Sequence, residues 1–275
     1  MQFASGTVTS PDGGIPHTVP PDAPVPRVEV LGVPISLVNL CTATETIIGW
    51  AASDRPNYVC VRDVHGVMRA QEDQDLLAIH QNAGMITPDG MPLVWLARRR
   101  GDSRVARAAG FDLLSAVCDR SREQGLRHFF YGGRDGVAER LAKALGERYP
   151  GLLVVGTYTP PFRPLSKDED REILNRINAS GADIVWVGLS TPKQEYWMRD
   201  HVDLIEGATL IGIGAAYDFH VGDVRRAPPW MRDNGFEWLY RFLNEPRRLW
   251  RRYLVMAPRF VFAVLREEVK GRRQR

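Results

Sequence analysis

The amino-acid sequence predicts an α/β protein with a mostly parallel sheet flanked by helices. Short apolar runs rich in β-forming residues alternate with stretches of helical length, and glycine, proline and aspartate gather at their junctions. Strands that alternate with helices in this way are joined by right-handed crossovers into one parallel sheet. With 275 residues, 44% of them hydrophobic, the chain can bury one substantial core.

The α/β domain is expected to span residues 27–224, between two extensions. Residues 1–26 are rich in Pro, Gly, Ser and Thr and poor in large apolar groups, which favours a disordered lead-in. Residues 241–275 hold ten Arg and one Lys against three Glu, a net charge of +8. The net charge of the whole chain is +3, so the other 240 residues have a net charge of −5. The cationic surface is therefore expected in a basic helical appendage, residues 225–275.

The elements of the domain are predicted in chain order from the same patterns. Residues 28–35 form a strand, a turn and a second short strand, and a helix follows over 42–52. Residues 58–61 form the next strand, and 65–81 a helix or a helix pair. The remaining strands are expected at 128–131, 152–155, 184–187 and 209–213, and the remaining helices at 111–123, 135–148, 167–179 and 192–200.

Composition and cysteine usage exclude several classes of protein. No window of about 18 uncharged apolar residues occurs, so we expect no membrane-spanning helix. The N-terminus lacks a basic flank followed by an apolar core, which argues against a secretory signal. The three cysteines, Cys41, Cys60 and Cys118, have no metal-ligand spacing, and we expect buried structural thiols in a reducing cytoplasm.

Two loops in the first half of the domain contain residue types suited to ligand binding. In residues 85–92 a Pro-Asp-Gly turn precedes an apolar helix, and Asp89 there can cap the helix or act as a base; the residues alone favour the cap. Residues 130–136 form a glycine-rich turn, where Gly132 and Gly133 let a phosphate or a nucleobase approach the backbone. A plain tight turn gives the same pattern.

Two further loops follow strands in the second half. The strand at 184–187 runs into a helix start at Pro192, where free N–H groups favour an anion beside Gln194 and Glu195. Farther on, Tyr217 and Asp218 offer a ring and a carboxylate to a base or a sugar hydroxyl, although a satisfied strand-end Asp explains the pattern equally well. Because loops after parallel strands converge on one crevice, we expect one cleft to collect Asp89, Gly132, Gly133, Gln194, Glu195, Tyr217 and Asp218.

In their order, these motifs resemble those of the WecG/TagA/CpsF glycosyltransferases of bacterial surface-polysaccharide synthesis. That family transfers a sugar from a UDP-sugar to a polyprenyl-diphosphate-linked acceptor, with inversion and without a required metal or other cofactor. The resemblance covers about residues 28–256 and implies the same Rossmann-like α/β fold, a mostly parallel sheet flanked by helices, and the same activity. It rests on Thr87-Pro-Asp-Gly-Met-Pro92, Phe130-Tyr-Gly-Gly133, Val187-Gly-Leu-Ser-Thr-Pro-Lys-Gln-Glu195, Gly212-Ile-Gly-Ala-Ala-Tyr-Asp218, Arg226-Ala-Pro, Glu237-Trp-Leu-Tyr-Arg241 and Glu245-Pro-Arg-Arg248.

The resemblance also implies a role for each matched residue. Asp89 becomes the expected general base, which takes the proton of the acceptor hydroxyl as that oxygen attacks the anomeric carbon opposite the departing UDP. The leaving diphosphate gains negative charge, and the arginines expected to balance it are Arg225, Arg226 and Arg241. The residues expected to hold the UDP-sugar are Gly132, Gly133, Gln194, Glu195 and Asp218.

One position departs from the family's pattern. The family shows Thr-x-Asn after the second core strand, where this chain has Val61-Arg-Asp63. Asp63 is expected to contact the substrate in place of the asparagine, whereas the threonine hydroxyl has no counterpart. The resemblance therefore does not identify the sugar, and it leaves open whether the protein is a homo-oligomer.

The C-terminal appendage predicts amphipathic helices. In residues 246–256 Leu249, Trp250, Tyr253 and Leu254 share one face and four arginines the other, and a second helix over 258–270 adds more apolar side chains. Such helices either pack on the core or lie on an anionic membrane surface. A lipid-linked acceptor favours the membrane, so we expect a peripheral protein on the inner face of the cell membrane.

Other functions are weighed against this one. A nucleic-acid-binding protein would use basic helices bearing Trp and Tyr, but it leaves the loops of Asp89 and Gln194 unexplained and the body of the chain is net acidic. A non-catalytic sugar-nucleotide-binding scaffold of a polysaccharide assembly complex is the other alternative. Two Asp-x-Asp pairs, at 73–75 and 168–170, are expected in helices and not around a metal.

Overall fold

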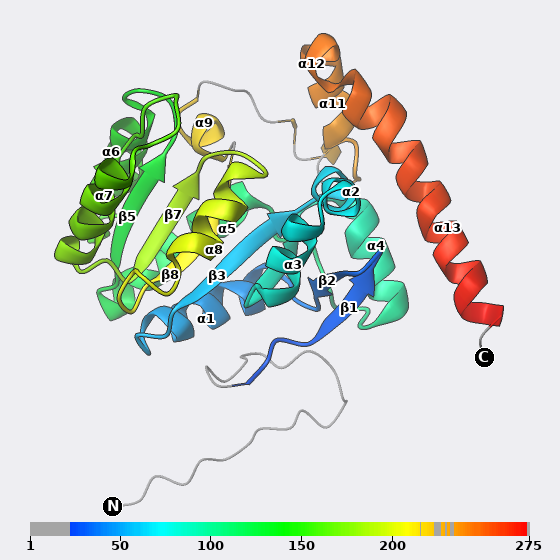
Figure 1. Ribbon diagram of the computed structural model, residues 1–275, viewed down its shortest axis with the longest axis horizontal. Helices are drawn as coiled ribbons and strands as arrows, with labels where there is room; N and C mark the ends of the chain where they lie inside the picture. Colours follow the sequence, from blue (N-terminus) through cyan, green and yellow to red (C-terminus); the bar gives the residue numbers. More distant parts are fainter. Residues whose placement is uncertain (1–22, 215, 223–226, 229, 232–233, 274–275) are drawn as a thin grey trace, which may run out of the picture.

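The computed structural model describes residues 23–214, 216–222, 227–228, 230–231 and 234–273. Its centre is a six-stranded parallel sheet in the order β4-β3-β8-β7-β5-β6, which confirms the predicted fold class (Figure 1). The strands are β3 (Asn57–Arg62), β4 (Met85–Pro88), β5 (Arg127–Gly132), β6 (Leu153–Tyr158), β7 (Ile184–Gly188) and β8 (Thr209–Gly212). An antiparallel hairpin, β1 (Arg27–Val30) and β2 (Val33–Ser36), precedes the sheet.

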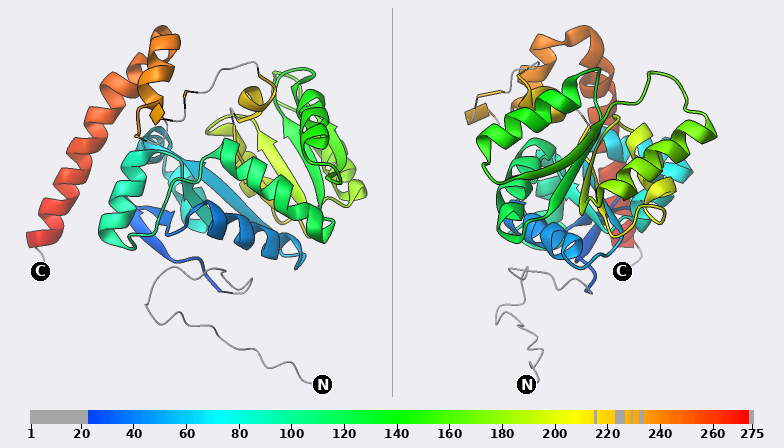
Figure 2. Two further views of the ribbon diagram at one scale, coloured as in Figure 1. Left: turned by 180° about the vertical axis from the view of Figure 1, so that it is seen from behind. Right: turned by 90° about the vertical axis from the view of Figure 1, so that its left-hand side faces the viewer.

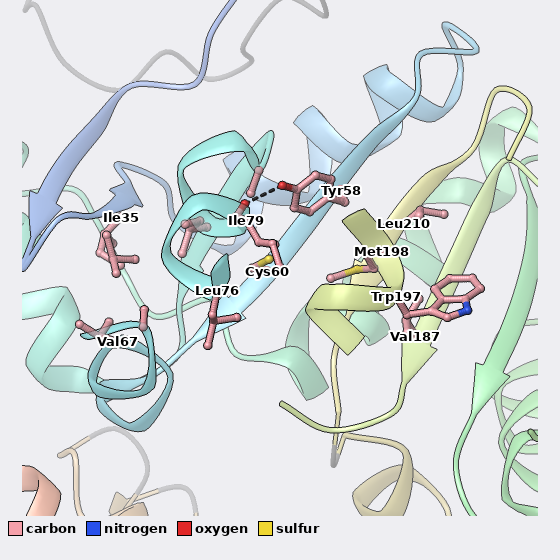
Figure 3. Packing of buried hydrophobic residues seen from close by; sticks show 14 of the residues in the cluster. Ile35, Tyr58, Cys60, Val67, Leu76, Ile79, Val187, Trp197, Met198 and Leu210 are labelled. Atoms are coloured by element: carbon pink, nitrogen blue, oxygen red, sulfur yellow. Dashed lines mark hydrogen bonds between the residues drawn. The ribbon is translucent and has the colours of Figure 1, made fainter. Parts of the chain in front are cut away.

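Helices cover both faces of the sheet. Side chains from α2, α3, α4, α7 and α8 form one apolar cluster, part of which Figure 3 shows, and those from α1, α5, α6 and α9 form the other. In β7, Trp186 faces one cluster and Val187 the other, as the period of two in a strand requires. The helices are α1 (Leu40–Ala51), α2 (Val64–Glu72), α3 (Gln74–Asn82), α4 (Met91–Arg100), α5 (Gly110–Ser121), α6 (Val137–Arg148), α7 (Lys167–Ser180), α8 (Lys193–His201) and α9 (Ala216–His220), with a 3₁₀ turn, η1 (Arg122–Gln124).

Most predicted elements are confirmed within a few residues, but β4 was predicted only as a loop. Its four residues, Met-Ile-Thr-Pro, are too few to show a period. All four are buried, because the hairpin covers this edge of the sheet and Ser36 Oγ accepts a hydrogen bond from Ile86 N at 2.9 Å. The predicted helix or helix pair at 65–81 is a pair, with Asp73 capping α3.

Two smaller expectations need comment. Cys60 and Cys118 are buried, but Cys41 is exposed near the start of α1, so the prediction of three buried thiols is wrong for Cys41. Of the predicted N-terminal lead-in, residues 1–22 lie outside the described residues. Val25 is buried, and Pro26 O accepts a hydrogen bond from Leu37 N at 2.8 Å.

The C-terminal appendage is helical, as predicted. It consists of α11 (Glu237–Asn244), α12 (Pro246–Trp250), a π-helical turn, η2 (Arg251–Met256), and the long α13 (Ala257–Arg273). Figures 1 and 2 show α13 along the side of the body formed by α2 and α4. Leu249, Phe260 and Val264 are buried, and Glu267 pairs with Arg100 of α4 at 2.8 Å. Among the residues that the structure describes, no helix is long and apolar enough to cross a membrane.

Candidate active site

Two neighbouring cavities open at the carboxyl edge of the sheet, each of about 230 Å³. The first lies where β3 and β8 end, which is the point at which the strand order reverses and where open α/β sheets bind their ligands. Its wall is rich in arginine, whereas Met91, Pro92, Trp238, Tyr253 and Ala257 line the second. Both cavities share the border residues Asp63, His65, Asp89, Arg107, Glu237, Arg241 and Arg252.

Asp89 lies on this border and does not cap a helix. The residue at the N-cap of α4 is Gly90, and no side chain caps that helix, so the capping interpretation is wrong. Arg107 donates two hydrogen bonds to Asp89, from Nε to the backbone oxygen at 2.6 Å and from Nη2 to Oδ1 at 2.9 Å. The same guanidinium also pairs with Glu237 of α11 at 2.7 Å. Asp89 is thereby fixed in orientation while a third of its side chain stays exposed.

The surroundings of Asp89 make it a stronger base than an ordinary aspartate. Burial disfavours the ionised carboxylate and raises the pKa of Asp89, and the nearby charges of Asp63 and Glu237 raise it further. Arg107 acts in the opposite direction without cancelling the shift. The arrangement suits a group that must accept a proton during a reaction.

Gln194 and Glu195 are both buried; Gln194 lines the first cavity, and Glu195 lies behind it. Glu195 pairs with Arg62, whose Nη1 donates to Thr191 Oγ1 at 2.9 Å. Gln194 Nε2 donates to Glu195 Oε1 at 2.7 Å, which leaves Gln194 Oε1 without a hydrogen-bond partner among the described residues. Gln194 and Arg62 line the cavity, and Glu195 holds both of them in position from behind.

The structure does not bring four of the predicted cleft residues to the cavities. Gly132 and Gly133 end β5, which is three strand spacings, or about 14 Å, from β3. A Cβ atom on Gly132 would lie 2.7 Å from the backbone of Gly188, so this turn needs glycine to pack against β7. Tyr217 is buried, with its hydroxyl donating to Trp186 O at 2.8 Å, and Asp218 pairs with Arg134 at 3.1 Å.

Two of the arginines that line the first cavity, Arg107 and Arg252, come from segments outside the quoted motifs. Arg241 lines both cavities and lies over the ring of Phe219, at 5.5 Å from its centroid. Arg225 and Arg226, predicted for the same task, lie outside the described residues. Arg107 and Arg252 were missed, because a lone arginine in a loop or a basic helix carries no local signal. Only the long-range pairing of each with a carboxylate identifies it.

Comparison with known proteins identifies the family of this chain. Residues 28–274 match the model of the glycosyl transferase WecG/TagA/CpsF family. The chain is also similar to N-acetylglucosaminyldiphosphoundecaprenol N-acetyl-beta-D-mannosaminyltransferase of Bacillus spizizenii, with 34% identity over 191 residues, which is 70% of this chain and 72% of the relative. This protein belongs to the WecG/TagA/CpsF family of glycosyl transferases.

Proposed function

We propose that this protein transfers a sugar from a UDP-sugar to a hydroxyl of a polyprenyl-diphosphate-linked saccharide, with inversion, in the synthesis of an extracellular or cell-surface polysaccharide. The observation that carries the proposal is the location of Asp89 on the border between an arginine-rich cavity and an apolar one. The first cavity suits a nucleotide diphosphate, and the second suits an acceptor attached to a lipid. The name of the relative from Bacillus spizizenii supports a diphosphate-linked polyprenyl acceptor.

In the proposed reaction the acceptor oxygen attacks the anomeric carbon of the donor sugar. As the new C–O bond forms, the bond from that carbon to the diphosphate breaks, and Asp89 takes the hydroxyl proton. UDP leaves with the bonding electron pair, so negative charge develops on the diphosphate. The guanidinium of Arg241 stabilises that charge, and the mechanism requires no metal ion.

The other predicted contacts fall into two groups in this proposal. Gln194 Oε1, buried and without a partner among the described residues, accepts a hydrogen bond from the sugar nucleotide. Glu195 acts indirectly by holding Gln194 and Arg62. Packing within the loops after β5, β7 and β8 is the role of Gly132, Gly133 and Tyr217. Asp218 pairs with Arg134 beside these loops.

We further propose that the appendage rests on the cytoplasmic face of the cell membrane. One side of the appendage contributes the buried Leu249, Phe260 and Val264 to the core, so packing on the body and contact with a membrane are compatible. The appendage also exposes large apolar residues, among them Trp238, Trp250, Leu254, Val261, Phe262, Leu265 and Val269. Basic side chains among them add attraction to anionic lipids, each by about 1 kcal/mol.

The proposal is tested with a panel of UDP-sugars and a short-chain polyprenyl diphosphate that carries N-acetylglucosamine. UDP release and the extended lipid product are measured, with and without a chelator. We expect one donor to be used at a rate far above the others, in both conditions. Hydrolysis without acceptor elongation, or loss of activity in chelator, would contradict the proposed reaction.

A further inference from the structure

Both carboxylate oxygens of Asp63 are engaged by groups of the protein. Oδ1 accepts a hydrogen bond from Gly66 N at 3.0 Å and so caps α2. Oδ2 pairs with Arg252 of η2, in the C-terminal appendage. The side chain is only 24% exposed. These contacts give Asp63 one partner on the body and another on the appendage, while its side chain also borders both cavities.

Asp63 is also the direct neighbour of Asp89 across the sheet. The parallel register pairs Arg62 with Pro88. Asp63 directly follows Arg62 and Asp89 directly follows Pro88, so these two residues leave the sheet side by side. The backbone of Asp89 is fixed there, because its N–H donates to Arg62 O at 2.7 Å. The backbones of adjacent strands lie about 4.8 Å apart. The charge of Asp63 is close enough to Asp89 to disfavour the ionised form of its carboxylate.

Two arginines oppose this repulsion. Each carboxylate has an arginine of its own: Arg107 from the body pairs with Asp89, and Arg252 from the appendage pairs with Asp63. The titratable and charged groups that share the border with Asp89 are Asp63, His65, Arg107, Glu237, Arg241 and Arg252. Of these, Asp63 is the acid that follows β3, the strand that pairs with the strand of Asp89, β4.

We propose that Asp63 and Arg252 form a positioning pair that sets how readily Asp89 accepts a proton. The charge of Asp63 increases the proton affinity of its neighbour, and Arg252 limits that effect. This role rests on the proposed function of Asp89 as the base. It makes the base dependent on a residue of the appendage that does not touch it.

The titration behaviour of the two acids agrees with this arrangement. Burial opposes ionisation of Asp63, but Arg252 and the Gly66 N–H outweigh it and hold the pKa of Asp63 well below its ordinary value. Asp63 therefore stays charged at the pH at which the enzyme works. That charge contributes to the raised pKa of Asp89, after burial, which is the largest cause.

A cycle of three variants tests the pair: Arg252→Gln, Asp63→Asn and the double variant. Arg252→Gln leaves Asp63 charged and unpaired, so the acid limb of the kcat/KM profile should move to higher pH by about one unit. Asp63→Asn keeps an oxygen for the Gly66 N–H but leaves Arg252 unpaired, so the limb should move to lower pH. The double variant should return toward the wild-type limb, and Arg252→Lys should retain it.

A second readout does not need turnover. The pKa of Asp89 is followed through the ¹³C shifts of the aspartate carboxyl carbons, with its signal assigned by its loss in Asp89→Asn, and it should shift in the same directions. Equal loss of activity at every pH in Arg252→Gln without rescue by Asp63→Asn, or an unshifted Asp89 signal, would overturn the inference. If the signal shifts as expected but Asp89→Asn still turns over, the pair stands and the proposed base fails.

Discussion

Replacing Glu195 with alanine should strongly destabilise the fold, because it leaves the charge of Arg62 buried without a counterion. The side chains of Arg62 and Glu195 are 3% and 0% exposed, and Glu195 Oε1 also accepts from Gln194 at 2.7 Å. Breaking a buried pair from one side costs about 3–5 kcal/mol. In a chain of this size that loss lowers the midpoint of thermal unfolding by about 6–20 °C.

The assay is thermal unfolding followed by circular dichroism, together with the affinity for UDP. The matched control replaces both partners, Arg62→Met with Glu195→Leu, which removes both charges at similar volume and should unfold within a few degrees of wild type. A Glu195→Ala protein that melts like wild type but no longer binds UDP would refute the reasoning. In that case Glu195 would contact the nucleotide itself, as the sequence first led us to expect.

Three further predictions concern the turn after β5, a buried histidine and the appendage. Gly133→Ala should lower the free energy of unfolding, measured with urea, by about 1–3 kcal/mol, because φ of Gly133 is +82° and the new Cβ would lie 3.2 Å from its neighbours. In the control Gly146→Ala, in α6, the new Cβ meets nothing within 4 Å, so this variant should be neutral or stabilising. Burial lowers the pKa of His128 to about 3, so below about pH 6.5 this side chain is protonated in the unfolded chain but not in the native state. The free energy of unfolding should therefore fall by about 2 kcal/mol between pH 7.5 and pH 5, and the variant His128→Gln should lack that pH dependence. Phe262→Ser should lower co-sedimentation with anionic vesicles by about tenfold. The control Phe162→Ser, which alters a more exposed phenylalanine outside the appendage, should not lower it.

The sequence was sufficient for the architecture because the relevant patterns are local. The apolar run of β7 and the glycine-rich end of β5 mark a strand and a turn from the side chains alone. β4 was missed because its burial comes from the hairpin, which packs on it from 50 residues upstream. The position of Cys41 on the exposed side of α1 depends on packing in the same way.

The site was harder to predict, because proximity in a sheet depends on strand order and not on sequence order. Every predicted loop does leave a strand at its carboxyl end, but the order β4-β3-β8-β7-β5-β6 separates Gly132 from Asp89 by four strand spacings. Gln194 follows β7 and Asp89 follows β4, with β8 and β3 between them. Both residues line the first cavity, which opens at the carboxyl ends of β3 and β8. Arg252 approaches Asp63 only through the fold of the appendage.

The most direct test of the proposed mechanism is the turnover of Asp89→Asn. The amide keeps the shape of the side chain but does not accept the proton, so kcat should fall by about 10²–10⁴-fold while the affinity for UDP changes little. Asp168→Asn, the same chemical change at an exposed residue of α7, serves as the control and should retain full activity. Turnover of Asp89→Asn at the wild-type rate would contradict the assignment of Asp89 as the general base.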